Sequence, residues 1–315
     1  MPTYPLVPVN LAKKMEVNKL HTFTGHRDCV YALEKDGLPH RFFSAAGDGM
    51  VVRWNLEQPD QGELIARVPA SVYALCHVPE DGQLWIGQNF DGLHVIDLDT
   101  KKETKSVKIT QSAIFDIKTW LSTVGVATGD GAVVFLDKET SSVRKTIRLS
   151  DKSARCLAVN PVGGEVAVGY SDHSVRVFDW QTLQLKHTIA AHGNSVFALH
   201  YSPDFRWLLS GGRDARINVW DTAATYAPHT SVVAHMFAIN HIVYRPDGQQ
   251  FATCSMDKSV KIWDAATFRL LKVIDKARHA GHATSINKLL WTGYANQLVS
   301  ASDDRSLSVW SMENN

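Results

Sequence analysis

Short runs in which apolar and polar residues alternate recur along the whole chain, separated by turn-forming residues. Examples are CVYALEKD, RFFSAAGD and MVVRWNL near the start, and SVFALHYS, WLLSGGRD and RINVWD further on. Alternation with a period of two, bounded by turn residues, indicates β-strands. Explicit turns follow in SPDF after Tyr201, RPDG after Tyr244 and PEDG after Val78. Because helical spacing is not evident, the pattern predicts an all-β protein.

A second pattern repeats over a longer distance. In four segments a His is followed after eighteen residues by Ser or Thr, after four more by Asp, and after six more by Trp. The four sets, called tetrads below, are His26, Ser44, Asp48 and Trp54; His192, Ser210, Asp214 and Trp220; His235, Thr253, Asp257 and Trp263; and His282, Ser300, Asp304 and Trp310. A repeat of this length is typical of propeller blades.

Three weaker copies lie between the first tetrad and the second, which makes seven units. The large residues that end the third strand of each unit recur at spacings of 40 to 47 residues: Trp54, Ile96, Leu136, Phe178, Trp220, Trp263 and Trp310. One such sheet cannot bury its apolar faces alone, so neighbouring sheets pack around a common axis. We therefore predict a single seven-bladed β-propeller of four-stranded antiparallel blades, with strands a to d in each blade.

The two ends of the repeat array predict how the ring closes. The last unit ends at Ser311, directly after its third strand, and lacks a fourth. Residues 17–23, VNKLHTF, precede the first Gly-His pair at the place where a fourth strand belongs. We expect this clasp strand to complete the last blade and so remove an exposed sheet edge. The domain prediction is one propeller over 1–315, with an N-terminal extension at 1–16, the clasp at 17–23, and blades ending near 54, 96, 136, 178, 220, 263 and 310.

Over about residues 17–311 the chain resembles the WD40-repeat family. The resemblance is carried by Gly25-His26 and Gly281-His282, by Trp220-Asp221 and Trp263-Asp264, and by the turns SAAGDG, SGGRD, TCSMDK and SASDDR. It implies that each tetrad forms a hydrogen-bonded chain inside its blade. This agrees with the need of buried imidazole, indole and carboxylate groups for partners.

The weaker units depart from the tetrad. The second unit has Val68 in place of the His; the third has Thr110, Val126, Asp130 and Leu136; the fourth has Ser150, Val168, Asp172 and Phe178. We expect blades 2 to 4 to have no such network and to depend on apolar packing.

Composition restricts the function further. Lys and Arg total 33 against 32 Asp and Glu, so the whole chain has no general attraction to nucleic acid or an anionic membrane. No apolar run is long enough to span a bilayer, and the first residues lack the pattern of a secretory signal. Cys29, Cys76, Cys156 and Cys254 lie far apart and form no CxxC pair, which favours a reducing, cytoplasmic location. The oligomeric state is left open.

The candidate chemistry does not favour an enzyme. Four of the fourteen histidines belong to the tetrads, and His279 and His282 have no carboxylate or cysteine at metal-ligand spacing. The chain has neither a G-x-S-x-G nucleophile motif nor a phosphate-binding G-x-x-x-x-G-K-[ST] loop. We therefore predict no catalytic residue, no metal and no cofactor.

Residues at the mouth of the channel are the candidate binding site. Strand a of each blade lines the channel, and the residue after its first apolar position should face the mouth: Tyr31, Tyr73, Phe115, Arg155, Phe197, Asn240 and Asn287. Arg213 and Met256 lie in nearby turns between strands b and c. A concave mouth with aromatic residues and Arg is typical of a recognition hot spot. Alternatively, the rings stack on one another and plug the channel.

A longer loop before the last blade, near DKARHAGH, is expected on the same face. Its Lys272, Lys276, Arg278 and His279 favour an acidic partner segment beside the mouth. The sequence thus predicts a non-enzymatic platform that binds a protein or peptide at the mouth. Two alternatives stay open. One is an enzyme or small-molecule sensor at the same mouth, which a bound metal or three perturbed carboxylates would favour. The other is an architectural subunit that binds through blade sides or the lower face.

Overall fold

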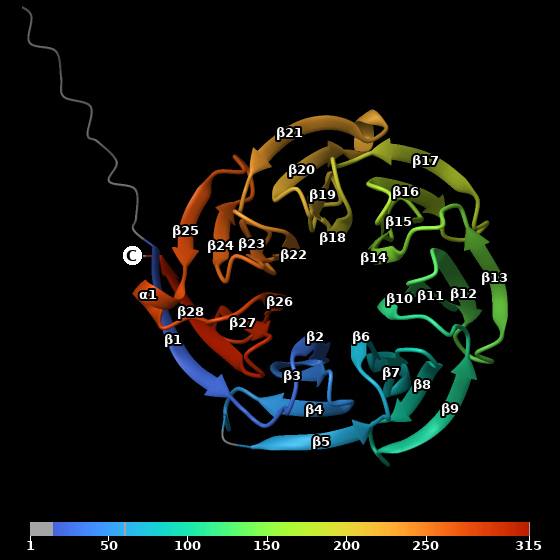
Figure 1. Ribbon diagram of the computed structural model, residues 1–315, viewed down its shortest axis with the longest axis horizontal. Coiled ribbons are helices and arrows are strands. Elements are labelled where there is room, and N and C mark those ends of the chain that lie inside the picture. The colour runs from blue at the N-terminus through green and yellow to red at the C-terminus, as the bar shows by residue number, and fades with distance from the viewer. Residues whose placement is uncertain (1–14, 60, 315) are drawn as a thin grey trace, which may run out of the picture.

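The computed structural model describes residues 15–59 and 61–314, which form seven four-stranded antiparallel sheets arranged in a ring (Figure 1). Each sheet is one blade, and its first strand lies nearest the central axis. The predicted all-β propeller is confirmed. Helical structure in the described residues is limited to α1 (Lys276–His279) and the short 3₁₀ turns η1 (Pro79–Asp81) and η2 (Thr222–Ala224).

The strands of the first four blades follow the chain in order. Blade 1 contains β2 (Val30–Asp36), β3 (Leu38–Ala46), β4 (Met50–Asn55) and β5 (Gly62–Arg67), and blade 2 contains β6 (Val72–Val78), β7 (Gln83–Gln88), β8 (Gly92–Asp97) and β9 (Lys102–Lys108). Blade 3 contains β10 (Ile114–Trp120), β11 (Thr123–Thr128), β12 (Ala132–Asp137) and β13 (Val143–Arg148), and blade 4 contains β14 (Ala154–Asn160), β15 (Glu165–Tyr170), β16 (Ser174–Asp179) and β17 (Leu185–Ala190).

The remaining blades repeat this order until the ring closes. Blade 5 contains β18 (Val196–Tyr201), β19 (Trp207–Gly212), β20 (Arg216–Asp221) and β21 (Ala227–Val233), and blade 6 contains β22 (Ile239–Tyr244), β23 (Gln250–Ser255), β24 (Val260–Asp264) and β25 (Leu270–Ile274). Blade 7 combines β26 (Ile286–Trp291), β27 (Gln297–Ser302) and β28 (Leu307–Asn314) with β1 (Met15–Phe23) from the other end of the chain.

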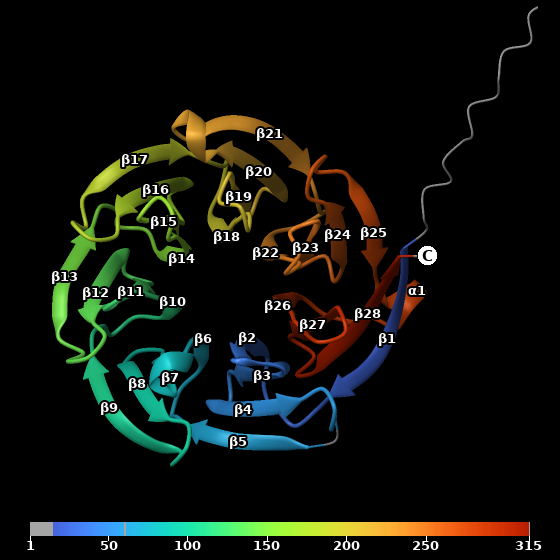
Figure 2. The same ribbon diagram turned by 180° about the vertical axis from the view of Figure 1, so that it is seen from behind.

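The N-terminal strand closes the ring as predicted. β1 runs antiparallel to β28, with Phe23 opposite Leu307 and Met15 opposite Asn314, and it follows the outside of blade 7 in both views (Figures 1 and 2). The strand begins at Met15, two residues before the predicted clasp of 17–23, because the pairing continues along a longer β28. Residues 1–14 of the predicted extension lie outside the described residues.

Packing of the clasp joins the last blade to the first. The buried ring of Phe23 lies 5.1 Å from the ring of Trp54 and 5.8 Å from that of Phe42, both in blade 1, measured between centroids. Met15 and Val17 are buried with Trp310 and Met312 at the other end of the strand. Burial of a side chain of this size is worth about 1.5–3 kcal/mol, so β1 contributes both an edge and core packing.

A β-bulge at the start of every innermost strand positions the channel mouth. In each of the seven blades the register shifts across the second residue of the strand, as between Val30 and Ala32 in β2. The residues that lie in these shifts are Tyr31, Tyr73, Phe115, Arg155, Phe197, Asn240 and Asn287. A bulge residue has no direct partner across the ladder and its side chain is re-aimed. One repeated backbone feature thus places seven different side chains around one opening.

Candidate functional site

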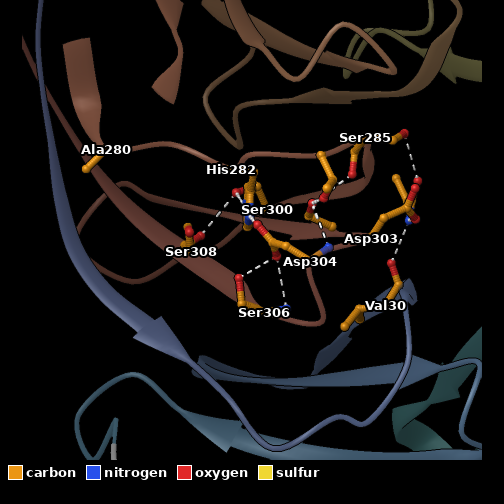
Figure 3. Close-up of polar contacts among 12 residues, drawn as sticks. Val30, Ala280, His282, Ser285, Ser300, Asp303, Asp304, Ser306 and Ser308 are labelled. Carbon is orange, nitrogen blue, oxygen red and sulfur yellow. Dashed lines mark hydrogen bonds and ion pairs between the residues drawn. The ribbon is translucent and has the colours of Figure 1, made fainter. Parts of the chain in front are cut away.

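The structure brings the four residues of every tetrad together. In blade 7 the Trp310 indole donates to Ser300 Oγ at 2.9 Å, and Ser300 Oγ lies 2.9 Å from His282 Nε2. His282 Nδ1 lies 2.8 Å from Asp304 Oδ2, and Figure 3 shows Asp304 also bound by Ser306. The chains from Trp54 to Asp48, from Trp220 to Asp214 and from Trp263 to Asp257 follow the same order. The four groups of each tetrad therefore bind one another within the blade.

The protonation of the tetrads follows from burial and from these bonds. Burial lowers the pKa of His26, His192 and His235 in spite of the carboxylate beside each ring. Burial opposes ionisation of Asp257, but hydrogen bonds from His235, Ser259 and Met236 outweigh it and lower the pKa of this carboxyl. A neutral imidazole that donates to a carboxylate is therefore favoured in blades 1, 5 and 6.

As expected, blades 3 and 4 contain no His–Ser/Thr–Asp–Trp network among the described residues, but their turn carboxylates make other polar contacts that the sequence did not predict. Asp130 accepts from Thr128 Oγ1 and forms an ion pair with Arg148. Asp172 pairs with Arg176 at 2.8 Å; burial opposes its ionisation, but Ser174, Ser150 and Arg176 lower its pKa to about 2. An arginine from a neighbouring strand takes the place of the missing His, and sequence spacing does not reveal which arginine reaches the turn.

The mouth residues of blades 1 to 5 form a continuous stack. The rings of Tyr31 and Tyr73 meet edge to face at 4.6 Å, and those of Tyr73 and Phe115 stack at 5.9 Å. The Arg155 guanidinium lies over Phe115 at 4.2 Å and over Phe197 at 5.4 Å. We call this row of five residues the aromatic arc. It follows the wall of a cavity of about 830 Å³ that runs along the channel, so stacking does not fill the channel.

The two asparagines at the mouth connect neighbouring blades. Asn240 Nδ2 donates to the Ile286 carbonyl at 2.8 Å. Asn287 Nδ2 donates to the Val30 carbonyl at 3.1 Å and to Asp303 Oδ1 at 2.7 Å, a link that Figure 3 shows between blades 7 and 1. These side chains hold the strands together, so the candidate surface is limited to the arc and the loops around it.

Two arginines give the mouth a positive charge. Arg155 is half-buried, and its Nε donates to Ser171 Oγ at 2.9 Å. Burial lowers the pKa of Arg155, and the nearby positive charge of Arg213 lowers it further. Two like charges at this opening favour an anionic partner group.

Exposed apolar side chains on blade 6 extend the mouth outward, and the sequence prediction included only one of them. Met256, in the turn between β23 and β24, is 52% exposed; Met236 and Phe237, in the loop before β22, are 82% and 58% exposed. We call these three residues the blade 6 patch. Its signal was available: the two residues after the tetrad His are Arg-Asp, Gly-Asn and Ala-Thr in the other three tetrad blades but Met-Phe here.

The basic loop does not lie beside the mouth, and that expectation is wrong. The insertion folds as α1 at the outer rim of the ring, next to β1 (Figure 1). Asp275 caps this turn and pairs with Arg278 at 2.6 Å, and Lys19 Nζ of β1 donates to the Ala280 carbonyl at the end of the loop at 3.0 Å. Lys272, on the preceding strand β25, donates to the Met15 carbonyl at 3.2 Å. The loop therefore supports the closing strand.

The enzyme alternative gains little from the geometry. The channel wall carries two acidic side chains, Glu34 and Asp116, where that alternative asked for three. Among the described residues, no group of three or more His, Cys, Asp or Glu is arranged to hold a metal ion. Within the same part of the chain, no helix has the length and apolar character needed to cross a membrane.

Comparison with known proteins agrees with the repeat pattern. The family model for the WD domain, G-beta repeat, matches residues 17–55, 183–221, 227–264 and 275–311, which are the four tetrad units. The chain is 25% identical to WD repeat-containing protein 1 of Gallus gallus, over 98% of this chain and 50% of that protein. It is 22% identical to the 66 kDa stress protein of Physarum polycephalum, over 93% of this chain and 48% of that protein.

A third relative is the nuclear distribution protein PAC1 of Arthroderma benhamiae, 24% identical over 67% of this chain and 48% of that protein. The chain spans about half the length of these curated relatives. The matched repeats, the tetrads and the ring of seven four-stranded blades lead to one assignment: the chain belongs to the WD40-repeat β-propellers.

Proposed function

We propose that this propeller is a non-enzymatic scaffold that binds a segment of a protein partner at the upper mouth of its channel, the face that carries the loops between blades. The observation that carries the proposal is the blade 6 patch: Met256 lies at the channel cavity, and its turn is hydrogen-bonded to the loop that exposes Met236 and Phe237. Clustered exposed apolar side chains often mark interaction sites, and burying each of them contributes about 1.5–3 kcal/mol.

The backbone under the patch is already ordered. Asp257 accepts from the Met236 N–H at 3.0 Å, Ser255 Oγ donates to the Phe237 carbonyl at 3.1 Å, and Met256 N–H donates to the Ala238 carbonyl at 3.1 Å. A binding surface held in this way loses little conformational freedom when a partner docks. The tetrad of blade 6 therefore supports the proposed site through Asp257.

The chemistry of the mouth favours an apolar segment with an acidic group. In the folded protein Arg155 already occupies the faces of Phe115 and Phe197, which leaves a cationic anchor little room there. Apolar side chains of the partner would pack on the blade 6 patch and on the edges of the arc, and its carboxylate would pair with Arg155 or Arg213.

Site-specific photo-crosslinking tests the proposal in the source cells. A benzophenone amino acid at position 237 should capture a discrete partner, and the additional exchange of Met256 for Ser should reduce that capture. The matched control carries the probe at Leu121, which is 72% exposed in the turn between β10 and β11 on the opposite face. Capture from position 121 but not from 237 would favour the architectural alternative and refute binding at the mouth.

A further inference from the structure

The residue directly after the bulge is small in four of the seven innermost strands. The seven equivalents are Ala32, Ala74, Asp116, Cys156, Ala198, His241 and Lys288. Small side chains suit this position because neighbouring blades approach closely there. The three polar exceptions in blades 3, 6 and 7 need an explanation, since a polar group next to an apolar core is costly without a partner.

Two of the exceptions do the same structural work. Asp116 Oδ2 accepts from the backbone N–H of Leu157 in blade 4 at 2.9 Å. His241 Nδ1 accepts from the backbone N–H of Leu289 in blade 7 at 3.3 Å. Leu157 and Leu289 occupy the same place on their strands, so each side chain joins its blade to the next one in the ring. Packing between blades accounts for both residues.

Lys288 cannot do this work, because an ammonium group only donates hydrogen bonds. Its side chain lines the channel cavity and makes no hydrogen bond or ion pair with residues 15–59 or 61–314. By contrast, Lys118 in the same cavity pairs with Asp116 at 3.0 Å. Lys288 is thus a cation held in the channel that the architecture of the blades does not explain.

The surroundings of Lys288 favour an anion. The cavity wall carries five basic side chains, Lys35, Lys118, Arg155, Arg245 and Lys288, against two acidic ones, Glu34 and Asp116. Arg245 pairs with Asp247 at 3.0 Å, so four of the five bases face these two acids. One of the acids, Asp116, is already engaged by Lys118 and Leu157. Low-dielectric walls strengthen the attraction of such an excess charge for a ligand of opposite sign.

Neutral histidines add directional groups. His241 accepts from Leu289 through Nδ1, so its proton lies on Nε2, which is a donor. His200 donates from Nδ1 to the Tyr201 carbonyl at 2.6 Å, so its Nε2 is an acceptor. Burial lowers the pKa of both rings, to about 4 for His200, which keeps them neutral at physiological pH. The apolar surface of the cavity is formed mainly by the aromatic arc, because the leucines of the innermost strands have their side chains buried in the cores of the ring. These leucines are Leu33, Leu75, Leu157, Leu199 and Leu289.

We propose that the channel is a binding site for a small organic carboxylate, with Lys288 as its anchoring cation and the aromatic arc as the contact surface for its apolar body. The volume of about 830 Å³ lies in the range of small-molecule pockets. This inference is independent of partner binding at the blade 6 patch, and either can fail alone.

The experiment compares acids with their neutral amides on the full chain. Calorimetry or ligand-observed NMR measures the binding of three acids: acetate, benzoate and 4-phenylbutyrate. The same assay is applied to the two matched amides, benzamide and 4-phenylbutyramide, and to inorganic phosphate. We expect benzoate or 4-phenylbutyrate to bind at least about tenfold more tightly than its amide, which corresponds to about 1.4 kcal/mol. Lys288→Met should remove this preference without weakening the amide, whereas Lys288→Arg should keep it.

Lys102→Met, on the outer strand β9, is the matched control and should change nothing, and the melting temperature of each variant checks that it folds. Equal binding of acid and amide, an unchanged preference in Lys288→Met, or no acid binding below about 10 mM would each overturn the proposal. Phosphate that binds as tightly as the aromatic acids would refute the role of the apolar wall.

The pH dependence separates Lys288 from its neighbours. Burial lowers the pKa of Lys288; Asp116 opposes this shift and Lys118 adds to it. Affinity for the acid should therefore fall as pH rises, at a lower pH than an ordinary lysine would give, and the fall should be absent in Lys288→Arg because arginine stays charged. The other titratable groups that face this lysine, Glu34, Asp116, Lys118, Cys156, His200 and His241, are the same in both proteins. A fall of equal size in Lys288→Arg would assign the effect to one of them.

Discussion

Replacing Asp257 with Ala tests the scaffold and the proposed binding surface together. The carboxylate accepts from His235 Nδ1 at 2.9 Å, from the Met236 N–H at 3.0 Å, and from the backbone and hydroxyl of Ser259 at 3.0 and 2.6 Å. Its side chain is 7% exposed. Removing it deprives the buried imidazole of its carboxylate acceptor, leaves only the more distant Ser259 Oγ at 3.2 Å, and frees the loop that carries Met236 and Phe237.

The expected loss follows from how many donors water can reach. The His235 ring is completely buried, so exchanging its carboxylate acceptor for the longer contact to Ser259 Oγ costs about 1–3 kcal/mol, while the exposed Met236 N–H can bind water instead. We expect Asp257→Ala to lower the free energy of unfolding by about 2–3 kcal/mol. Asp214→Ala should lower it by about 1–3 kcal/mol. Asp130→Ala is the matched control. Its partner Arg148 is 56% exposed, and an exposed ion pair contributes about 1 kcal/mol or less.

Urea denaturation measures the difference in unfolding free energy between the variants and the wild type. The midpoint urea concentrations are compared, provided that the unfolding free energy depends on urea concentration with the same slope in each protein. Asp257 has a lowered pKa in the folded state, so its stabilisation is present above the unfolded value of about 3.9 and is lost as pH falls through the folded value. The gap between the wild type and Asp257→Ala should therefore narrow in acid. Equal losses for Asp257→Ala and Asp130→Ala, or a gap that does not depend on pH, would refute the structural role of the tetrad carboxylate.

Three further outcomes are expected. Truncation of residues 1–23 removes β1 and exposes the edge of β28, so the protein should become insoluble or lose cooperative unfolding; an unchanged melting curve would contradict closure by this strand. Tyr73→Ala with Phe197→Ala should abolish partner binding while a Lys102→Ala control binds normally, because interface energy concentrates in central aromatic residues; normal binding by the double variant would place the site elsewhere. Stability should fall as pH drops through about 6.5, since burial lowers the pKa of three tetrad histidines, and a melting temperature that does not change between pH 8 and 5 would contradict this. The three are His26, His192 and His235.

The fold could be predicted because the same pattern of strands and turns recurs in seven units of the sequence. The tetrad Trp and its apolar equivalents mark the end of strand c, and the missing last strand together with the spare segment before His26 indicates the closure. Even the mouth positions followed from the repeat, since the bulge occurs at the same place in all seven innermost strands. The local sequence pattern was sufficient to predict the features that all seven blades share.

Prediction failed where contacts depend on distances between blades or between distant strands. The pairing of Asp130 with Arg148 requires that two strands of blade 3 bring an acid and a base together, which spacing alone does not show. The basic loop lies at the outer rim of the ring, and its position depends on contacts that the sequence does not show. Asp275 caps α1 there, and Lys272 of β25 donates to the backbone of β1. Whether Tyr73 and Phe115 stack along the wall or across the channel likewise depends on the angle between neighbouring blades.

Repetition also gives a way to separate structural departures from functional ones. A residue that differs from its equivalents in the other blades has a structural explanation if it bonds to the neighbouring blade. Asp116 and His241 have this explanation, because each accepts a hydrogen bond from the backbone of the next innermost strand. Lys288 has no such explanation, since it is a cation in the channel with no partner among the described residues. Met236 and Phe237 have none either, since they are apolar side chains exposed on an ordered loop. Both departures carry a cost in the isolated protein, through charge desolvation and through apolar exposure. A ligand carboxylate would offset the first cost and a partner segment the second, so these two places are where function is expected.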